Sequence, residues 1–173
     1  MLEALIFVVF PFCMVFAALS DMLSMTIANR VSLLLIAVFA VVAPLTGMGW
    51  AAVGAHFAAG ALVLAVTFGL FALGGMGGGD AKLMSATAIW MGLSLNLVEY
   101  LVVSTVIGGA LTLAIVGYRN SALAVYTGGN PFLRHLADSK TGIPYGIALG
   151  LGGLVTYPSS PLMAWALQSL ASQ

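Results

Sequence analysis

The chain has 173 residues, of which 62% are hydrophobic and only 6% are charged, and its formal net charge at neutral pH is zero. A soluble globular domain carries roughly a quarter of its residues as Asp, Glu, Lys or Arg, so this composition excludes an ordinary soluble domain. It predicts an all-α integral membrane protein whose surface is covered mostly by the lipid bilayer.

Six apolar runs are candidates for membrane spans, each of which takes roughly 17 to 25 residues as a helix. In chain order they cover residues 5–19, 31–48, 52–73, 83–95, 97–117 and 143–157. The fourth rises only about 20 Å as a helix, so we expect it to begin inside the membrane or to thin it locally. Gly92, Ser94 and Asn96 predict a tight hairpin between the fourth and fifth runs. The sequence therefore predicts one domain over residues 1–173, a bundle of about six transmembrane helices.

The basic residues all fall on one side of this arrangement. They lie in the first, third and fifth connections, and they are Arg30, Lys82, Arg119, Arg134 and Lys140. Because Lys and Arg collect in short cytoplasmic loops, both termini are predicted to lie outside. Asp21 and Asp80, which follow the first and third runs, are then predicted to face the cytoplasm.

These two aspartates are the main candidates for chemistry. A carboxylate at membrane depth is costly unless it is paired or hydrated, so it is by default a functional-site hypothesis. Two carboxylates at hydrogen-bonding distance share one proton, so that one can take a proton from water while the other donates one. For Asp21 alone, marking the membrane surface or capping a helix is equally consistent with the sequence.

A run of glycines precedes Asp80, and residues 74–79 read Gly-Gly-Met-Gly-Gly-Gly. A backbone without Cβ allows an extended peptide to approach closely, so Gly77, Gly78 and Gly79 are predicted to bind substrate. The alternative is a flexible hinge between the third and fourth spans. Nucleotide binding fits worse, because no Lys-Ser or Lys-Thr follows the glycines.

Lys82 is a further candidate for substrate binding, but a helix starting at Asp80 would point the two side chains to different faces. Lys82 is then expected to extend to the membrane interface. His56 in the third span is expected to hydrogen-bond a neighbouring helix, and Glu3 and Glu99 to be solvated helix ends. No metal site and no organic cofactor are expected.

Two further segments carry weaker predictions. The long connection 118–142 is expected to contain a short interfacial helix that begins at Asn130 and Pro131 and either gates the substrate or anchors the loop. Gly142, Gly146 and Gly150 recur every four residues and predict a face for close helix packing, within the bundle or between two copies.

Three segments resemble one known family, the type IV prepilin peptidases, which are membrane aspartic proteases. Residues 77–83, Gly-Gly-Gly-Asp-Ala-Lys-Leu, resemble the family's Gly-x-Gly-Asp motif and its Lys-Leu extension. Asp21 followed by residues 26–30 resembles the first catalytic block, with Ala28 in place of the usual proline. Residues 140–146 resemble the segment that opens the last span.

This resemblance implies that Asp21 and Asp80 form a catalytic dyad that removes the short basic leader of a prepilin or pseudopilin. It implies cleavage at the cytoplasmic end of the substrate's hydrophobic helix, in the bacterial inner membrane, without a cofactor and without a nucleic-acid partner. The chain resembles the short form of tight-adherence (Flp) pilus systems, which lacks a methyltransferase region and works with a pilus assembly machinery. Oligomeric state is left open.

Two other functions stay open from the residues alone. A small proton-coupled transporter or channel subunit would use Asp21 and Asp80 as a proton relay, although such proteins often carry internal repeats and none is found here. A non-enzymatic assembly subunit is the third possibility.

Overall fold

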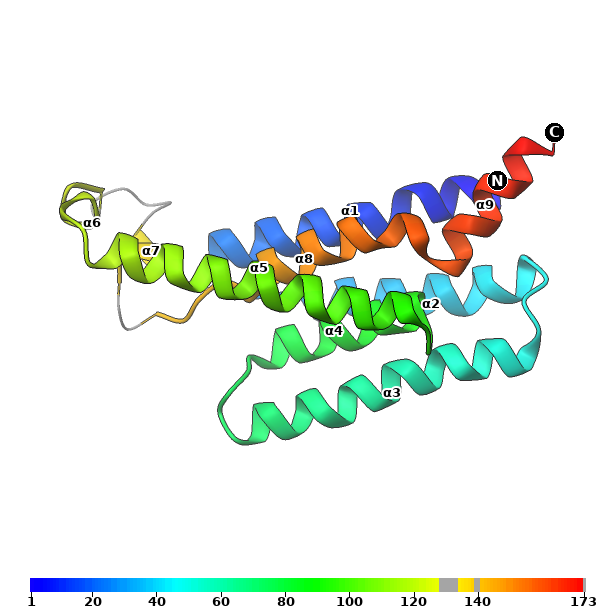
Figure 1. The fold of residues 1–173 in the computed structure, drawn as a ribbon, viewed down its shortest axis with the longest axis horizontal. Helices are drawn as coiled ribbons and strands as arrows, with labels where there is room; N and C mark the ends of the chain where they lie inside the picture. The colour runs from blue at the N-terminus through cyan, green and yellow to red at the C-terminus, as the bar shows by residue number, and fades with distance from the viewer. Residues whose placement is uncertain (128–133, 139–140, 173) are drawn as a thin grey trace.

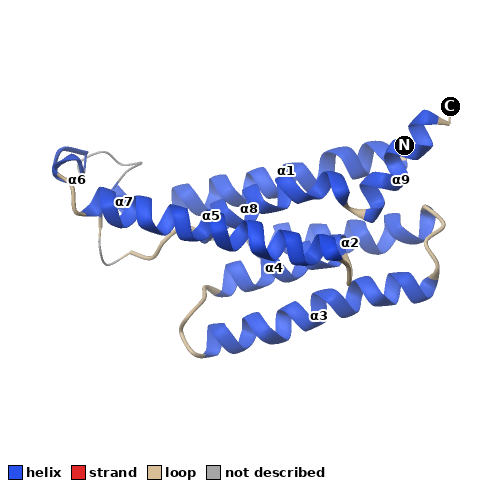
Figure 2. Ribbon diagram, in the orientation of Figure 1, coloured by secondary structure: helices blue, strands red, loops and turns tan. Residues whose placement is uncertain are grey.

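The computed structural model describes residues 1–127, 134–138 and 141–172, and all regular elements in this part of the chain are helices (Figure 2). In chain order they are α1 (Leu2–Ser24), α2 (Asn29–Leu45), α3 (Trp50–Ala72), α4 (Gly78–Met91), α5 (Leu95–Arg119), α6 (Ala122–Thr127), α7 (Arg134–Ala137), α8 (Tyr145–Thr156), the 3₁₀ helix η1 (Tyr157–Ser159) and α9 (Pro161–Ala171).

The six predicted runs correspond to α1 to α5 and α8. Among the described helices, α1, α3 and α5 are long and apolar enough to cross a bilayer, while α2 is apolar but has 17 residues. α4 and α8 are shorter still, with 14 and 12 residues. The chain is therefore a helical membrane protein, in which three of the described helices have the length and the apolar composition of a membrane span.

The long helices lie side by side, and both termini lie at the same end of the bundle (Figure 1). The connections after α1, α3 and α5 lie at the opposite end, which brings Arg30, Lys82 and Arg119 to that end. Lys140 and the side chain of Arg134 lie outside the described residues. The end that carries these basic residues is called the basic end below.

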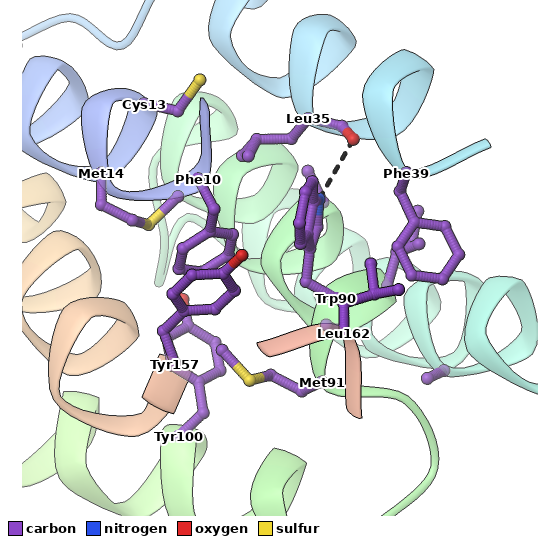
Figure 3. Packing of buried hydrophobic residues seen from close by; sticks show 14 of the residues in the cluster. Phe10, Cys13, Met14, Leu35, Phe39, Trp90, Met91, Tyr100, Tyr157 and Leu162 are labelled. Atoms are coloured by element: carbon purple, nitrogen blue, oxygen red, sulfur yellow. Dashed lines mark hydrogen bonds between the residues drawn. The ribbon is translucent and has the colours of Figure 1, made fainter. Parts of the chain in front are cut away.

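α4 is the central helix of the bundle and packs against α2, α3 and α8. An aromatic cluster near its C-terminal end holds it in place (Figure 3). Phe10 of α1 stacks on Tyr157 with ring centroids 4.0 Å apart, and Trp90 lies 5.2 Å from Phe10 and 5.8 Å from Phe39. Trp90 Nε1 also donates to the Leu35 carbonyl over 3.1 Å, which satisfies its buried polar atom. These contacts fix α4, and with it Asp80 at the other end of the helix.

The predicted hairpin between α4 and α5 is confirmed. Gly92 adopts φ +69°, which favours glycine, and a Cβ there would lie 2.7 Å from His56 Cε1. Ser94 caps α5 by accepting a hydrogen bond from the Asn96 amide. His56 Nδ1 lies 2.6 Å from the Ile89 carbonyl of α4, so the predicted bond from His56 to a neighbouring helix is also confirmed.

Several expectations differ from the structure. α1 continues to Ser24, so Asp21 lies in its last turns and not after the helix. Gly78 and Gly79 form the first turn of α4, so the helix begins within the glycine run and not at position 83. α6 and α9 were not expected. The six residues of α6 are too few to show a helical period, and the eleven residues of α9 include Gln168 and Ser169, which weaken its apolar signal.

Glu3 is not a fully solvated helix end, because its Oε1 accepts a hydrogen bond from Ser169 Oγ of α9 over 2.9 Å. Glu99 is exposed, as expected. In the fifth connection a short helix is present as α7, but Asn130 and Pro131, its expected start, lie outside the described residues.

Candidate active site

Asp21 is a buried carboxylate at the basic end of α1, with 6% of its surface exposed. Its Oδ2 accepts a hydrogen bond of 2.7 Å from the backbone amide of Gly146. Gly146 is the second residue of α8, and amides in the first turn of a helix have no partner within the helix. The start of α8 therefore binds and orients the Asp21 carboxylate, which the helix dipole also favours.

Close approach of α8 to α1 depends on the glycine at position 146. A Cβ there would lie 2.8 Å from Asp21 Cβ and 2.9 Å from Asp21 Oδ2, both well inside ordinary van der Waals contact. One turn further along α8, a Cβ on Gly150 would lie 2.7 Å from the Met14 carbonyl oxygen. The predicted glycine face is therefore confirmed for Gly146 and Gly150, and it packs within the bundle. Gly142 precedes the helix.

The segment before α8 is held by the end of α5. Arg119 donates hydrogen bonds to the carbonyls of Leu136, over 2.8 Å, and of Gly142, over 2.9 Å. These carbonyls lie on either side of residues 139–140, so one guanidinium connects α5, α7 and the approach to α8. The contact fixes where α8 begins, and so where the Gly146 amide points.

Asp80 lies in the first turn of α4 and is partly buried. Gly77 is the N-cap residue of this helix, with φ −71° and ψ 142°. A Cβ on Gly77 would lie 2.7 Å from Asp80 Oδ2, so a side chain at this position would displace the carboxylate. The glycine before the helix thus makes room for Asp80. Its expected contact with substrate stays a prediction.

Asp21 and Asp80 line one cavity of about 230 Å³ at the basic end of the bundle. The remaining lining residues come from the glycine run and from the connection between α1 and α2, and they are Met25, Thr26, Ile27, Gly77, Gly78 and Gly79. At about 30 Å³ of liquid volume per molecule, such a cavity has room for several waters, and the carboxylates supply the polar partners that water requires. The structure thus places both carboxylates on the wall of one cavity that has room for water.

The connection between α1 and α2 forms one wall of this cavity. Met25 adopts the left-handed conformation, with φ 54° and ψ 30°, and its amide donates to the Asp21 carbonyl over 2.8 Å. Ala28 is the N-cap residue of α2, with φ −65° and ψ 131°. Because proline fixes φ near −65°, alanine here keeps the backbone that proline would impose.

Ile27 fills the space between two glycines of this site. A Cβ on Gly79 would lie 3.2 Å from Ile27 Cβ, and a Cβ on Gly146 would lie 2.9 Å from Ile27 Cδ1. The absence of side chains at these positions lets α4 and α8 close around the connection from α1. Close helix packing thus accounts for Gly79, whose predicted contact with substrate stays a prediction.

Lys82 lies away from the two carboxylates. Its Nζ donates to Asn29 Oδ1 of α2 over 3.0 Å, and the side chain lines a separate cavity beside α2. The expectation that Lys82 and Asp80 point to different faces is confirmed. A role for Lys82 in substrate binding stays a prediction.

Sequence reasoning missed the Gly146 amide as part of the site. The glycine pattern pointed only to helix packing, and a hydrogen bond between residues 125 positions apart depends on how α8 meets α1. One feature of the sequence could have indicated this role: Gly146 is the last residue of the segment 140–146, at the start of a helix, where backbone amides are free to bind a carboxylate. In the part of the chain that the structure describes, no group of three His, Cys, Asp or Glu side chains could hold a metal.

Two carboxylates that line one small cavity within a bundle of apolar helices form an arrangement suited to acid–base chemistry. Residues 8–116 match the type IV leader peptidase family, and this stretch covers more than half of the chain and contains both Asp21 and Asp80. The chain therefore belongs to the type IV leader peptidase family, and the family implies that it is a peptidase. No curated protein and no solved structure matches the chain.

Proposed function

We propose that the protein is an intramembrane aspartic endopeptidase that removes the short basic leader of type IV prepilins or pseudopilins of the Flp type. Asp21 and Asp80 form its catalytic dyad. The observation that carries this proposal is that both carboxylates line one cavity of about 230 Å³. Family membership adds the class of reaction, and it favours a peptidase over the proton relay that the two aspartates alone would also fit.

In the proposed reaction one aspartate is ionised and the other carries the shared proton. The ionised carboxylate takes a proton from a cavity water, whose oxygen attacks the scissile carbonyl. The protonated carboxyl hydrogen-bonds the carbonyl oxygen, and a proton then passes to the leaving amine as the C–N bond breaks. The products are a new carboxyl terminus on the leader and a new amino terminus on the pilin, and the pair as a whole titrates, not either residue alone.

The proposed setting is the bacterial inner membrane, with six spans in a single domain, both termini outside and the dyad at the cytoplasmic face. The location of Arg30, Lys82 and Arg119 at the same end of the bundle as the cavity supports this orientation. The proposed partners are the prepilin, the lipid bilayer and a pilus assembly machinery. We propose no methyltransferase activity and no cofactor.

Co-expression with candidate Flp-type prepilins tests the proposed function. The substrate's size is followed on a gel for the wild type and for Asp80→Asn at matched membrane levels, and mass spectrometry locates the cut. Cleavage at the end of the leader that is lost in Asp80→Asn supports the peptidase. A wild type that cleaves no prepilin would instead favour the alternative function, a transporter or channel subunit in which Asp21 and Asp80 relay protons.

A further inference from the structure

A long apolar groove runs along the bundle between α3 and α5, with α4 as its floor. Its volume is about 820 Å³. Leu62, Val66 and Leu70 form the α3 wall, Val98 and Leu101 form the α5 wall, and Met84 of α4 lies on the floor. Four of these side chains have more than 40% of their surface exposed, namely Leu62, Leu70, Val66 and Val98. Protein side chains therefore leave this groove open along its length.

The groove offers no polar group that needs a partner among the described residues that line it. Its hydroxyls come from Thr67, Ser94 and Thr105. Each donates to a carbonyl of its own helix or turn, over 2.8, 3.0 and 2.7 Å respectively. A ligand that matches this surface is apolar along its whole side, because a polar group placed there would lose its hydrogen bonds.

The groove extends from the α4–α5 hairpin to the glycine run that precedes Asp80. One end lies at the α4–α5 hairpin, at Leu93 and Leu95, and the other reaches Met76 in the glycine run. Met76 is followed directly by Gly77, which lines the cavity of Asp21 and Asp80. α4, which runs beneath the groove, is about 21 Å long at 1.5 Å per residue. A helix seated along it would span much of the membrane and would end beside the dyad.

The neighbouring face offers a poorer entry. Between α2 and α3 there is a smaller cavity of about 320 Å³, and it carries the Lys82–Asn29 hydrogen bond together with Ser32 and Ser85. An apolar helix seated there would bury an ammonium group, which is expensive in the membrane. An apolar helix that approaches the dyad from the lipid therefore binds in the α3–α5 groove at a lower cost in free energy than in the cavity between α2 and α3.

The proposed position of the cut agrees with this docking. The backbone of a helix within the bilayer is hydrogen-bonded internally, so its peptide bonds are protected along its length. Only the residues that leave the helix at its end can present a carbonyl to the carboxylates. A groove that ends at Met76 places that exit beside the cavity.

We propose that the groove between α3 and α5 binds the apolar transmembrane helix of the prepilin, which enters sideways from the bilayer and presents its cytoplasmic end to Asp21 and Asp80. This assignment rests on the proposed function. In this assignment α3 and α5 contact the transmembrane helix of the substrate. The glycine run and the start of α8 surround the peptide segment that is cut.

Cysteine cross-linking tests this assignment directly. Cys13 is the single cysteine of the chain, so Cys13→Ala gives a clean background. Val98→Cys places a thiol in the groove, and Val8→Cys on α1 is the matched control, since these valines are 55% and 61% exposed on different faces. Both are combined with Asp80→Asn to retain uncut prepilin, and single cysteines are scanned through the substrate's apolar helix in native membranes.

We expect cross-links from position 98 to substrate positions that recur with helical spacing, and none above background from position 8. Equal cross-linking from both positions, or from position 8 alone, would overturn the assignment. A cross-link between two copies of position 98 that added prepilin does not displace would also overturn it, by showing that a second copy of the chain fills the groove.

A kinetic comparison separates this assignment from the proposed function. Val98→Trp should raise the prepilin concentration needed for half-maximal cleavage by about tenfold with little change in the maximal rate, because it fills the groove without touching the dyad. Val8→Trp should behave as the wild type. Normal cleavage by Val98→Trp overturns the groove alone, whereas a wild type that cleaves no prepilin removes the proposed function and the groove assignment with it.

Discussion

Gly146→Ala tests how closely the reaction depends on the placement of Asp21. The new Cβ would lie 2.8 Å from Asp21 Cβ and 2.9 Å from Asp21 Oδ2. Carbon atoms in good contact are about 3.5 Å apart, so the two Cβ atoms must separate by roughly 0.7 Å. The same movement stretches the hydrogen bond from the Gly146 amide, which is 2.7 Å long.

A displacement of this size should have a large effect on catalysis. A misplacement of about 1 Å at a reacting group lowers rates by about a hundredfold. We therefore expect Gly146→Ala to slow cleavage by about tenfold to a hundredfold per folded molecule, which corresponds to about 1.4 to 2.7 kcal/mol in the activation free energy. The assay is the initial rate of prepilin cleavage by purified protein, with thermal unfolding in the same detergent as the measure of folding.

Gly150→Ala is the matched control for this experiment. It lies one turn along the same face of α8, and its Cβ would meet the Met14 carbonyl of α1 at 2.7 Å. It should destabilise the α1–α8 contact by about 1 to 3 kcal/mol, as overpacking does, yet leave the rate per folded molecule within a factor of about two. Equal losses of rate in both variants, or full activity in Gly146→Ala, would refute the positioning role of the Gly146 amide.

Three further substitutions have definite expected outcomes. Ala28→Pro should stabilise the protein by about 0.4 to 1 kcal/mol, because position 28 already has φ −65°; a lower melting temperature would contradict this. His56→Leu removes the partner of the Ile89 carbonyl and should lower the free energy of unfolding by about 1 to 3 kcal/mol, while cleavage per folded molecule is retained. Lys82→Met should keep its maximal cleavage rate at saturating prepilin, because Lys82 bonds Asn29 and lies away from the cavity; a tenfold loss of that maximal rate would place the ammonium group in the reaction.

The helices were predictable because apolar runs and glycine turns are local signals. The short fourth run and the hairpin at Gly92 were read directly from residue types, and the structure has both. α9 was missed because it has only 11 residues, which begin with Pro161 and include Gln168 and Ser169, so it is too short and too polar for a span. Its burial depends on docking against α1 and η1, which no local pattern encodes.

The candidate site was predictable in its residue types but not in its construction. An intramembrane carboxylate is conspicuous in a chain with ten charged residues, so Asp21 and Asp80 could be chosen from composition and motif. Their common cavity depends on long-range packing. Only the structure shows why positions 77 and 146 are glycines. A Cβ on Gly77 would displace the Asp80 carboxylate, and a Cβ on Gly146 would displace that of Asp21. The two-residue spacing between Asp80 and Lys82 was enough to predict that their side chains point to different faces of the helix, and the hydrogen bond from Lys82 to Asn29 agrees with that prediction.

The most direct test of the dyad is cleavage by Asp21→Asn and Asp80→Asn, purified side by side with the wild type and Glu99→Gln. Glu99 is an exposed carboxylate at the start of α5, at the end of the bundle opposite the cavity, and serves as the control. We predict that each Asn variant loses cleavage while its melting temperature stays within a few degrees of the wild type, and that Glu99→Gln cleaves normally. Cleavage retained by either folded Asn variant would contradict a mechanism that needs both carboxylates.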